Sequence, residues 1–143
     1  MDYKIETKTY QIKVAEDQAP TLCQPKIVFN ILKEDFSPVS ESMYLLSLNV
    51  KNQLIDKILI AKGTYNALMI KPIDIFRPLL ATAGNHFIIA HNHPSGDAMY
   101  SEDDIVFTNK LKKASEVMGI SFLDHIIFTD KEFVSLRQKG IIS

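Results

Sequence analysis

The spacing of apolar residues predicts regular elements in the first third of the chain. Polar and apolar residues alternate from Thr9 to Val14, as they do in a half-buried strand. Between Lys26 and Phe36 the apolar residues recur at every third or fourth position, which predicts an amphipathic helix that ends at Ser37-Pro38. The run from Met43 to Val50 is largely apolar and is predicted to be a buried strand.

The middle of the chain continues with a predicted hairpin and a helix. Lys51-Asn52 has the character of a turn, and Leu54 to Ala61 is predicted to be the partner strand. Pro72 opens a predicted helix that extends to about Ala83 and closes at Gly84-Asn85. Pro78 inside this helix removes an amide donor, so it is expected to bend or split the helix.

The last third alternates strands and a long helix. A short apolar strand from His86 to Ala90 precedes a loop rich in turn-forming residues, and a helix then runs from Ser101 to Gly119. Two strands follow, Ser121 to Phe128 and the shorter Phe133 to Leu136. This order predicts one mixed α/β domain with a central sheet flanked by helices. Residues 1–36 are predicted to form a strand-helix appendage to a domain made by residues 37–143.

Length and composition are those of one globular domain. The chain has 143 residues, of which 46% are hydrophobic, and a formal net charge of −1. This charge gives no support to binding of nucleic acid, and the cluster of Lys110, Lys112 and Lys113 is predicted to be a solvated helix face. The single cysteine, Cys23, excludes an intrachain disulfide and a thiolate metal cluster. The sequence shows no secretory signal and no apolar run of bilayer length, which predicts a soluble, cytoplasmic protein without a membrane partner.

The stretch HNHPSGDAMYSEDD, residues 91–104, carries the chemistry. His91 and His93 are two residues apart at the end of a predicted strand, so both imidazoles project from one face if the extended backbone persists through Asn92. Asp104 falls in the first turn of the following helix if Ser101 is its N-cap, and it is placed to add an oxygen ligand. Two histidines and one carboxylate leave a fourth tetrahedral position open, which is typical of catalytic zinc.

Each part of this motif also has a plain structural interpretation. A pair of histidines at a strand end often only binds loop backbone, and Ser101-x-x-Asp104 is by itself a helix capping pattern. The combined spacing is far more specific, because a ligand pair, a tight turn and a carboxylate at a helix start occur in one span. The sequence therefore predicts a metal site. A free carboxylate beside such a site would accept a proton from the bound water.

At this point the chain resembles a known family. Residues 91–104 match the JAMM (MPN+) metallopeptidase motif, His-x-His followed by seven residues and Ser-x-x-Asp. Within that superfamily the chain is similar to the RadC family of bacterial proteins. The similarity rests on HNHPSGD, the Ser-Glu-Asp-Asp helix start, Gly119-Ile120 and LDHII at residues 123–127, and it extends from about Glu41 to Gly140. The resemblance implies a single three-layer domain of the cytidine-deaminase-like, JAMM/MPN type.

The resemblance also implies roles for individual residues. His91, His93 and Asp104 would hold one zinc ion, and Ser101 would bind the carbonyl oxygen as it becomes an oxyanion. The catalytic glutamate of the family lies on an early element, and Glu41 at the entry to the strand fits that place best. Glu34, near the end of the first predicted helix, is the alternative candidate.

Two other histidines are given supporting functions. His125, which is within the family match, is not expected to be a ligand and either supports a ligand or the strand. His86 is predicted to be a hydrogen-bonded structural residue.

The chain departs from the family pattern at several positions. Ala98-Met99-Tyr100 stands where RadC proteins usually have Pro-Thr-Pro, and these residues are expected to affect substrate preference by lining a groove. Pro72-Ile73-Asp74 replaces the usual Pro-Arg-Glu. The helix-hairpin-helix module of longer RadC proteins, which is the part most readily connected with DNA, is not in this sequence. The resemblance therefore gives little support to a function of this chain in DNA repair.

Three functions remain open from the sequence. The first is a zinc metalloprotease that cleaves a peptide or isopeptide bond of a protein substrate with metal-activated water. The second is a DNA-repair accessory protein of the RadC kind without proteolytic turnover. The third is a scaffold whose fold is stabilised by metal.

Overall fold

The fold was analysed in a computed structural model that describes residues 19–22, 24–63 and 69–143. The predicted strand from Thr9 to Val14 and the single cysteine, Cys23, lie outside these residues. The described residues form one mixed five-stranded sheet with the strand order β2-β1-β3-β4-β5. The strands are β1 (Ser42–Leu48), β2 (Leu54–Lys62), β3 (His86–Asn92), β4 (Ser121–Phe128) and β5 (Phe133–Ser135).

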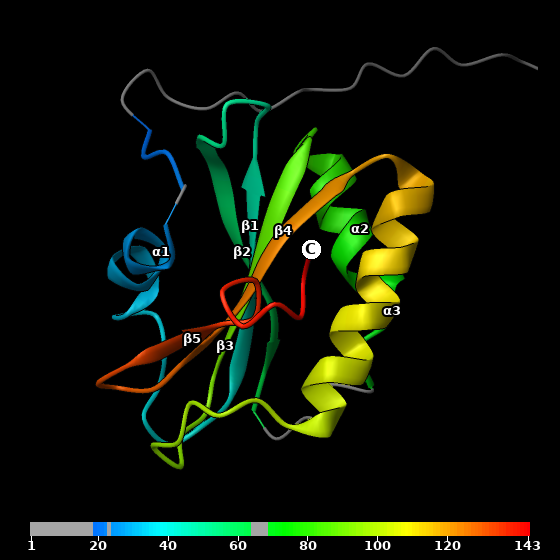
Figure 1. Cartoon of the computed structure of the whole chain (residues 1–143). Coiled ribbons are helices and arrows are strands. Elements are labelled where there is room, and N and C mark those ends of the chain that lie inside the picture. The colour runs from blue at the N-terminus through cyan, green and yellow to red at the C-terminus, as the bar shows by residue number, and fades with distance from the viewer. Residues whose placement is uncertain (1–18, 23, 64–68) are drawn as a thin grey trace, which may run out of the picture.

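Three helices cover the two faces of this sheet. Figure 1 shows α1 (Pro25–Leu32) on one face, with α2 (Pro72–Ala81) and α3 (Glu102–Met118) on the other. Alternation along the strands divides the apolar residues between the two faces. Met43 and Leu45 of β1 join the core under α2 and α3, whereas Leu46 and Leu48 join the core under α1. The predicted α/β class and three-layer arrangement are confirmed.

None of the helices in the described part of the chain is both long and apolar enough to cross a bilayer.

β3 and β4 are parallel, so the chain must cross over between them, and α3 forms this connection. β1 pairs antiparallel with both β2 and β3, and β4 pairs antiparallel with β5. Because α3 connects β3 to β4, the carboxyl end of β3 and the first turn of α3 meet at one edge of the molecule (Figure 1). This is where ligands bind in open α/β sheets.

The predicted elements match the observed ones except at some boundaries. α1 ends at Leu32, four residues before the predicted end, and the chain then turns so that Phe36 packs against Tyr44 and Phe128. β3 continues two residues beyond the predicted Ala90 and ends at Asn92, so the extended backbone includes His91. The hairpin turn is as predicted, with Asn52 at a left-handed φ of 60°.

Pro78 does not split α2, and the predicted closure at Gly84 is present in part, because the Gly84 amide donates to the carbonyl of Leu79 at 3.0 Å. Pro78 lies within one continuous helix, because its missing hydrogen bond leaves only the carbonyl of the exposed residue Asp74 without a helical donor. The left-handed residue after the helix is Ala83, at a φ of 55°, and not Gly84. Gly84 is required for a different reason, since a Cβ there would overlap the side chains of Ser47 and Leu79.

Candidate metal centre

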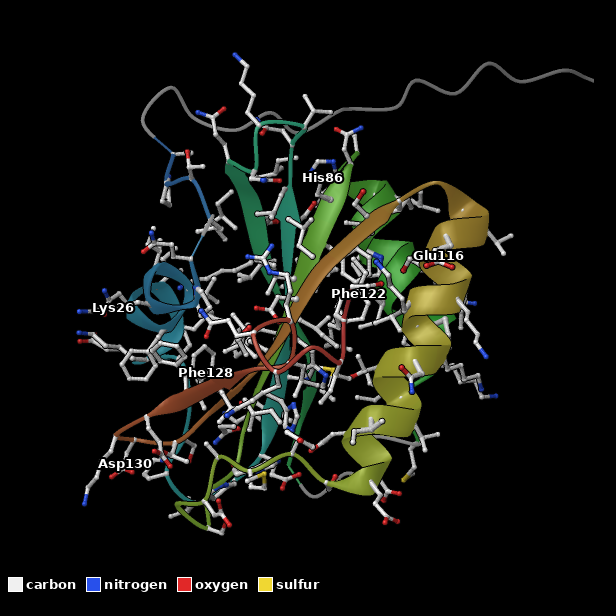
Figure 2. The ribbon with its side chains drawn as sticks, in the orientation of Figure 1. Lys26, His86, Glu116, Phe122, Phe128 and Asp130 are labelled. Atoms are coloured by element: carbon white, nitrogen blue, oxygen red, sulfur yellow. The ribbon has the colours of Figure 1, made fainter. Side chains whose placement is uncertain are left out.

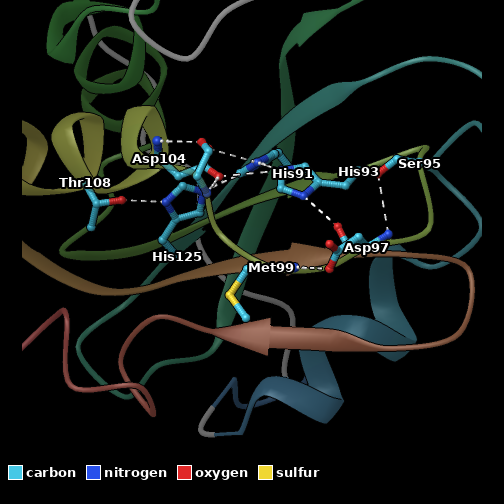
Figure 3. A network of polar contacts seen from close by, with 9 residues as sticks. His91, His93, Ser95, Asp97, Met99, Asp104, Thr108 and His125 are labelled. Atoms are coloured by element: carbon cyan, nitrogen blue, oxygen red, sulfur yellow. Dashed lines mark hydrogen bonds and ion pairs between the residues drawn. The ribbon is translucent and has the colours of Figure 1, made fainter.

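The predicted ligands His91, His93 and Asp104 converge in the structure. Their ligand atoms all lie within 4.8 Å of one another, which makes them a group that can hold a metal ion. The Nε2 atoms of the two histidines are 3.0 Å apart. Asp104 Oδ1 is 3.3 Å from His91 Nε2, and Asp104 Oδ2 is 3.5 Å from His93 Nε2 (Figure 3).

These separations suit a tetrahedral first-row metal ion. Ligand atoms bonded to tetrahedral zinc at about 2.0–2.2 Å are about 3.3–3.5 Å from one another. The separations of 3.0, 3.3 and 3.5 Å, which involve both oxygens of Asp104, approach these values, and one ligand atom from each residue lies within 4.8 Å of the other two. His91 and Asp104 are buried, at 3% exposure each, while His93 is partly exposed and leaves one side of the cluster open. The donor set and its open side fit a catalytic zinc site with three protein ligands.

The outer nitrogens of both histidines are already engaged. His93 Nδ1 is 2.9 Å from the carbonyl oxygen of Asp97, so it carries a proton that it donates. His91 Nδ1 is 2.7 Å from His125 Nε2, and His125 Nδ1 is 2.7 Å from the hydroxyl of Thr108. The network is consistent if each Nδ1 donates, which leaves the Nε2 lone pairs of His91 and His93 free. Both lone pairs then point toward the Asp104 carboxylate. Electron-donating atoms that face one another in this way can bind a cation between them.

The charges of the cluster shift the pKa values of its members. Burial alone would raise the pKa of Asp104, but hydrogen bonds with His91 and His93 outweigh burial and hold this pKa far below its usual range. The hydrogen bond with Asp104 raises the pKa of His93, against burial and with the help of the Asp97 carbonyl and the Glu41 charge. Burial holds the pKa of His125 well below its usual value, so His125 is neutral.

Glu41 lies near His93. Met43 is opposite His91 in the antiparallel β1–β3 pair, and Glu41 and His93 are each two residues beyond this pair, just past the end of the ladder. Met43 belongs to the core on the α3 face, and alternation puts Glu41 on that same face, which is the face of the ligands. Its charge contributes to the raised pKa of His93. The alternative candidate, Glu34, is exposed in the turn after α1 and is not in the metal-binding group.

Asn92 ties the segment before Glu41 to the strand of the ligands. Its side chain is buried between the two histidine positions and points to the opposite face of β3. Its Nδ2 donates to the carbonyl oxygens of Ser37 and Ser40, and its Oδ1 accepts from the amide of Ser42 at 2.7 Å. One side chain thus holds both ends of the short segment that carries Glu41. The sequence analysis treated Asn92 only as a spacer between the histidines.

Ser101 is the N-cap of α3, as predicted. Its Oγ accepts from the amide of Asp104 at 3.1 Å, and Asp104 Oδ2 accepts from the amide of Ser101 at 2.8 Å. This capping box fixes the carboxylate of Asp104 beside the histidines. The Ser101 hydroxyl proton is not used by the cap, and the residue is exposed, so it can donate to a bound group.

The departures noted in the sequence have distinct positions. Ala98 is buried in the core on the α3 face, at 1% exposure, and Tyr100 packs against that core. Met99 leaves 59% of its surface exposed. Met99 is therefore the member of this tripeptide with most surface available to a ligand.

Comparison with known proteins agrees with these observations. The model of the RadC-like JAB domain matches residues 22–141. The chain belongs to the RadC family. The match begins before Glu41 and includes α1, while the predicted boundary after residue 36 stays a prediction.

Curated relatives in the RadC family cover most of this chain. A UPF0758 protein of Carboxydothermus hydrogenoformans is 42% identical over 118 residues, which are 82% of this chain and 52% of the relative. A UPF0758 protein of Aquifex aeolicus is 38% identical over 118 residues, or 82% and 51% of the two chains. The UPF0758 protein YsxA of Bacillus subtilis is 34% identical over 131 residues, or 91% and 57%. The chain spans about half the length of the curated relatives it matches.

His125 of this RadC-family domain is expected to strengthen metal binding without touching the metal. Its hydrogen bond holds the ring of His91 in one orientation and one tautomer, and loss of such an outer partner typically costs 10–100-fold in metal affinity. We expect His125→Leu to weaken zinc binding by about this factor. The measurement is competition for zinc with a chromophoric chelator.

The matched control for this variant is His86→Leu. His86 is bonded to Asn52 Oδ1 at 2.6 Å, which confirms its predicted structural function, and Figure 2 shows it at the opposite end of β3. His86→Leu should leave the zinc affinity unchanged. Equal affinity in the parent and in His125→Leu, with both folded by circular dichroism, would contradict the assigned function of His125.

Proposed function

We propose that this RadC-family domain is a zinc-dependent hydrolase that cleaves an amide bond, in a peptide or an isopeptide, by attack of a water molecule. The observation that carries the proposal is the convergence of two free Nε2 lone pairs and one carboxylate at separations of 3.0–3.5 Å. The family match and the open side at His93 support it. Peptide or protein as the substrate class is part of the proposal.

The groups around the cluster are suited to such a reaction. Zinc held by His91, His93 and Asp104 would lower the pKa of a bound water to about 7 and polarise a substrate carbonyl. Glu41 takes the proton of the attacking water and later transfers it to the leaving amine. The Ser101 hydroxyl donates a hydrogen bond to the carbonyl oxygen as negative charge develops on it. The capping box and Asn92 hold these groups in position before the substrate binds.

Removal and return of the metal test this proposal. We expect protein purified without added zinc to contain about one zinc ion per chain, because the described residues form one complete ligand set. Hydrolysis of a library of linear and isopeptide-linked peptides, followed by mass spectrometry, should stop after chelation. It should return when one equivalent of zinc is added.

A titration with duplex DNA at two salt concentrations distinguishes the DNA-repair alternative. Tight binding with a steep salt dependence, together with an intact peptide library, would favour an accessory protein that contacts DNA phosphates. A net charge of −1 provides no basic excess for such binding. Chelation that lowers the melting temperature while no peptide and no DNA is affected would favour the scaffold.

A further inference from the structure

The chain around Glu41 is not held by either strand ladder of β1. The β1–β3 ladder ends at Met43 and the β1–β2 ladder ends at Ser42, so Glu41 lies outside both. The amide of Gly63, which follows β2, donates to the carbonyl oxygen of Glu41 at 2.8 Å. A single backbone bond fixes one point of the chain but leaves rotation about it, so further contacts decide how Glu41 is oriented.

The side chain of Asn92 supplies these contacts. Its Nδ2 donates to the carbonyl oxygens of Ser37 at 2.9 Å and of Ser40 at 3.0 Å. Its Oδ1 accepts from the amide of Ser42 at 2.7 Å. Ser40 and Ser42 are the two neighbours of Glu41 in the chain. One side chain therefore clamps the backbone immediately before and immediately after the proposed base.

The chemistry of the Asn92 amide matches this clamp. Its Nδ2 carries two hydrogens, which reach two carbonyl oxygens, and its Oδ1 carries the lone pairs that accept the amide of Ser42. A carboxylate or an apolar side chain of similar size could not reproduce the two donated bonds. Asn92 is also buried, at 4% exposure, so water does not compete freely for these bonds.

Polar contacts hold this segment because apolar packing does not. Pro38 is exposed, and Val39 leaves 86% of its surface exposed. The tip of the segment between Ser37 and Ser40 therefore buries no apolar side chain. Loss of the clamp would free the chain before Glu41 to move, and the carboxylate would move with it.

The predicted zinc ligands have supports that do not involve the Asn92 side chain. His91 and His93 each have an outer hydrogen-bond partner elsewhere, and the helix cap holds Asp104. Because side chains alternate along β3, Asn92 points to the opposite face of the strand from the two histidines. Its side chain can therefore act on Glu41 without acting on the ligands.

We propose that Asn92 is a positioning residue, whose side-chain amide sets the orientation of Glu41 toward the attacking water and thereby controls turnover and not metal affinity. This inference rests on the proposed hydrolysis at the metal centre. It assigns a function in the proton-transfer step to the residue that stands between the two histidine ligands.

Kinetics of Asn92→Ala, with the library peptide that the parent cleaves fastest, test this inference. We expect kcat to fall at least about tenfold, because displacement of a catalytic group by about 1 Å can cost about 100-fold. KM should stay within about threefold, because Asn92 is buried. Zinc affinity should also stay within about threefold, well below the effect of a lost outer partner of a ligand. Asn92→Asp keeps an acceptor for Ser42 but loses both donated bonds, and it should behave in the same way.

The double variant Asn92→Ala/Glu41→Gln distinguishes positioning from a general loss of structure. A residue that acts only through Glu41 has no further effect once the base is gone. We therefore expect turnover of the double variant within about threefold of that of Glu41→Gln alone. Structural damage that is independent of Glu41 would instead multiply with the loss of the base, and it would overturn the inference.

Asn49→Ala is the matched control. Asn49 also makes three side-chain hydrogen bonds in a turn: its Oδ1 accepts from the amides of Lys51 and Gln53, and its Nδ2 donates to the side chain of Gln53. This turn joins β1 to β2, at the end of β1 opposite to Glu41. Asn49→Ala should keep the kcat, the KM and the zinc affinity of the parent.

Hydrogen exchange of the Ser42 amide, followed by NMR in the zinc-loaded protein, tests the clamp without turnover. This amide donates to the Asn92 side chain, so it should exchange at least about tenfold more slowly than in an unstructured chain. Asn92→Ala should remove this protection and leave that of the amides in the middle of β1. Rapid exchange of the Ser42 amide in the parent would overturn the clamp even if Asn92→Ala did not fold.

The outcomes separate this inference from the proposed function. An unchanged kcat in folded, zinc-loaded Asn92→Ala would overturn the inference and leave the proposed function in place. Zinc content that falls as far as turnover would assign Asn92 to the metal site and also overturn the inference. If the parent cleaves no peptide, the proposed function fails. A protected Ser42 amide would then reveal a clamp with a structural function alone, and the inference would fail as well.

Discussion

The Glu41→Gln variant is expected to keep its zinc and lose its hydrolysis. General acid–base catalysis by a positioned carboxylate contributes about 10²–10⁴-fold to the rate, so kcat should fall by at least about 100-fold. The amide of glutamine has nearly the shape of the carboxylate but cannot take a proton from water. Zinc content by mass spectrometry should remain that of the parent, because Glu41 is not among the three ligand residues.

The expected effect follows from where Glu41 sits. Glu41 comes two residues before Met43, which pairs with His91, and the charge of Glu41 acts on the pKa of His93. Asn92 holds the carbonyl of Ser40 and the amide of Ser42, which are the neighbours of Glu41 on either side. The backbone on both sides of Glu41 is thus held in place, close enough to the histidines for its charge to act on His93.

Glu34→Gln is the matched control for this experiment. Glu34 is the other candidate base from the sequence, and it is exposed in the turn after α1. The same chemical change there should leave both zinc content and hydrolysis unchanged. Full activity of Glu41→Gln would remove Glu41 from the mechanism, and a loss confined to Glu34→Gln would transfer the function of the base to Glu34.

The sequence predicts the convergence of His91, His93 and Asp104 because their placement is local. A period of two along an extended backbone is sufficient to bring His91 and His93 to one face, and β3 does extend through Asn92. The capping pattern of Ser101 predicts that Asp104 lies in the first turn of α3, and both of its hydrogen bonds are present. Asp104 is the N3 residue of the capping box and also a member of the group that can hold a metal ion, so the capping interpretation is confirmed and is compatible with the chemical one.

The residues that the sequence does not predict depend on contacts between distant segments. His125 lies 34 residues from His91 in the sequence. The parallel β3–β4 pairing brings its ring beside His91, and the position of Thr108 on α3 lets the same ring bond to both His91 and Thr108. The bonds of Asn92 to the segment after α1 likewise span more than 50 residues. No periodicity within a window of the sequence carries such information. LDHII at residues 123–127 signalled His125 only through its likeness to the family.

The boundary errors have local causes. Gly84 satisfies the usual rule for a helix cap, yet the left-handed residue is Ala83, and glycine is needed at residue 84 because Ser47 and Leu79 approach its Cα closely. Phe36 has the spacing of a helical residue, but its ring packs against Tyr44 and Phe128 only because α1 has already ended. In both cases packing between elements overrides a pattern within one element.

The His93→Ala variant is expected to lose its metal. Removal of this imidazole leaves His91 and Asp104, and two ligands are too few for a catalytic zinc site. We expect the zinc content to fall from about one ion per chain to under about one tenth after dialysis against metal-free buffer. Hydrolysis of the peptide library should fall to background with it. Zinc content and turnover are measured on the same preparation.

Thermal unfolding provides an independent test of the same loss. A ligand present at 100 times its dissociation constant stabilises the native state by about 2.7 kcal/mol. Chelation should therefore lower the melting temperature of the parent, and it should leave that of His93→Ala unchanged because no metal remains to be removed. His86→Ala, at the other end of β3, should respond to chelation as the parent does. If His93→Ala still held one zinc ion and still responded to chelation, the metal would be bound elsewhere, and the convergence of these side chains would have no catalytic meaning.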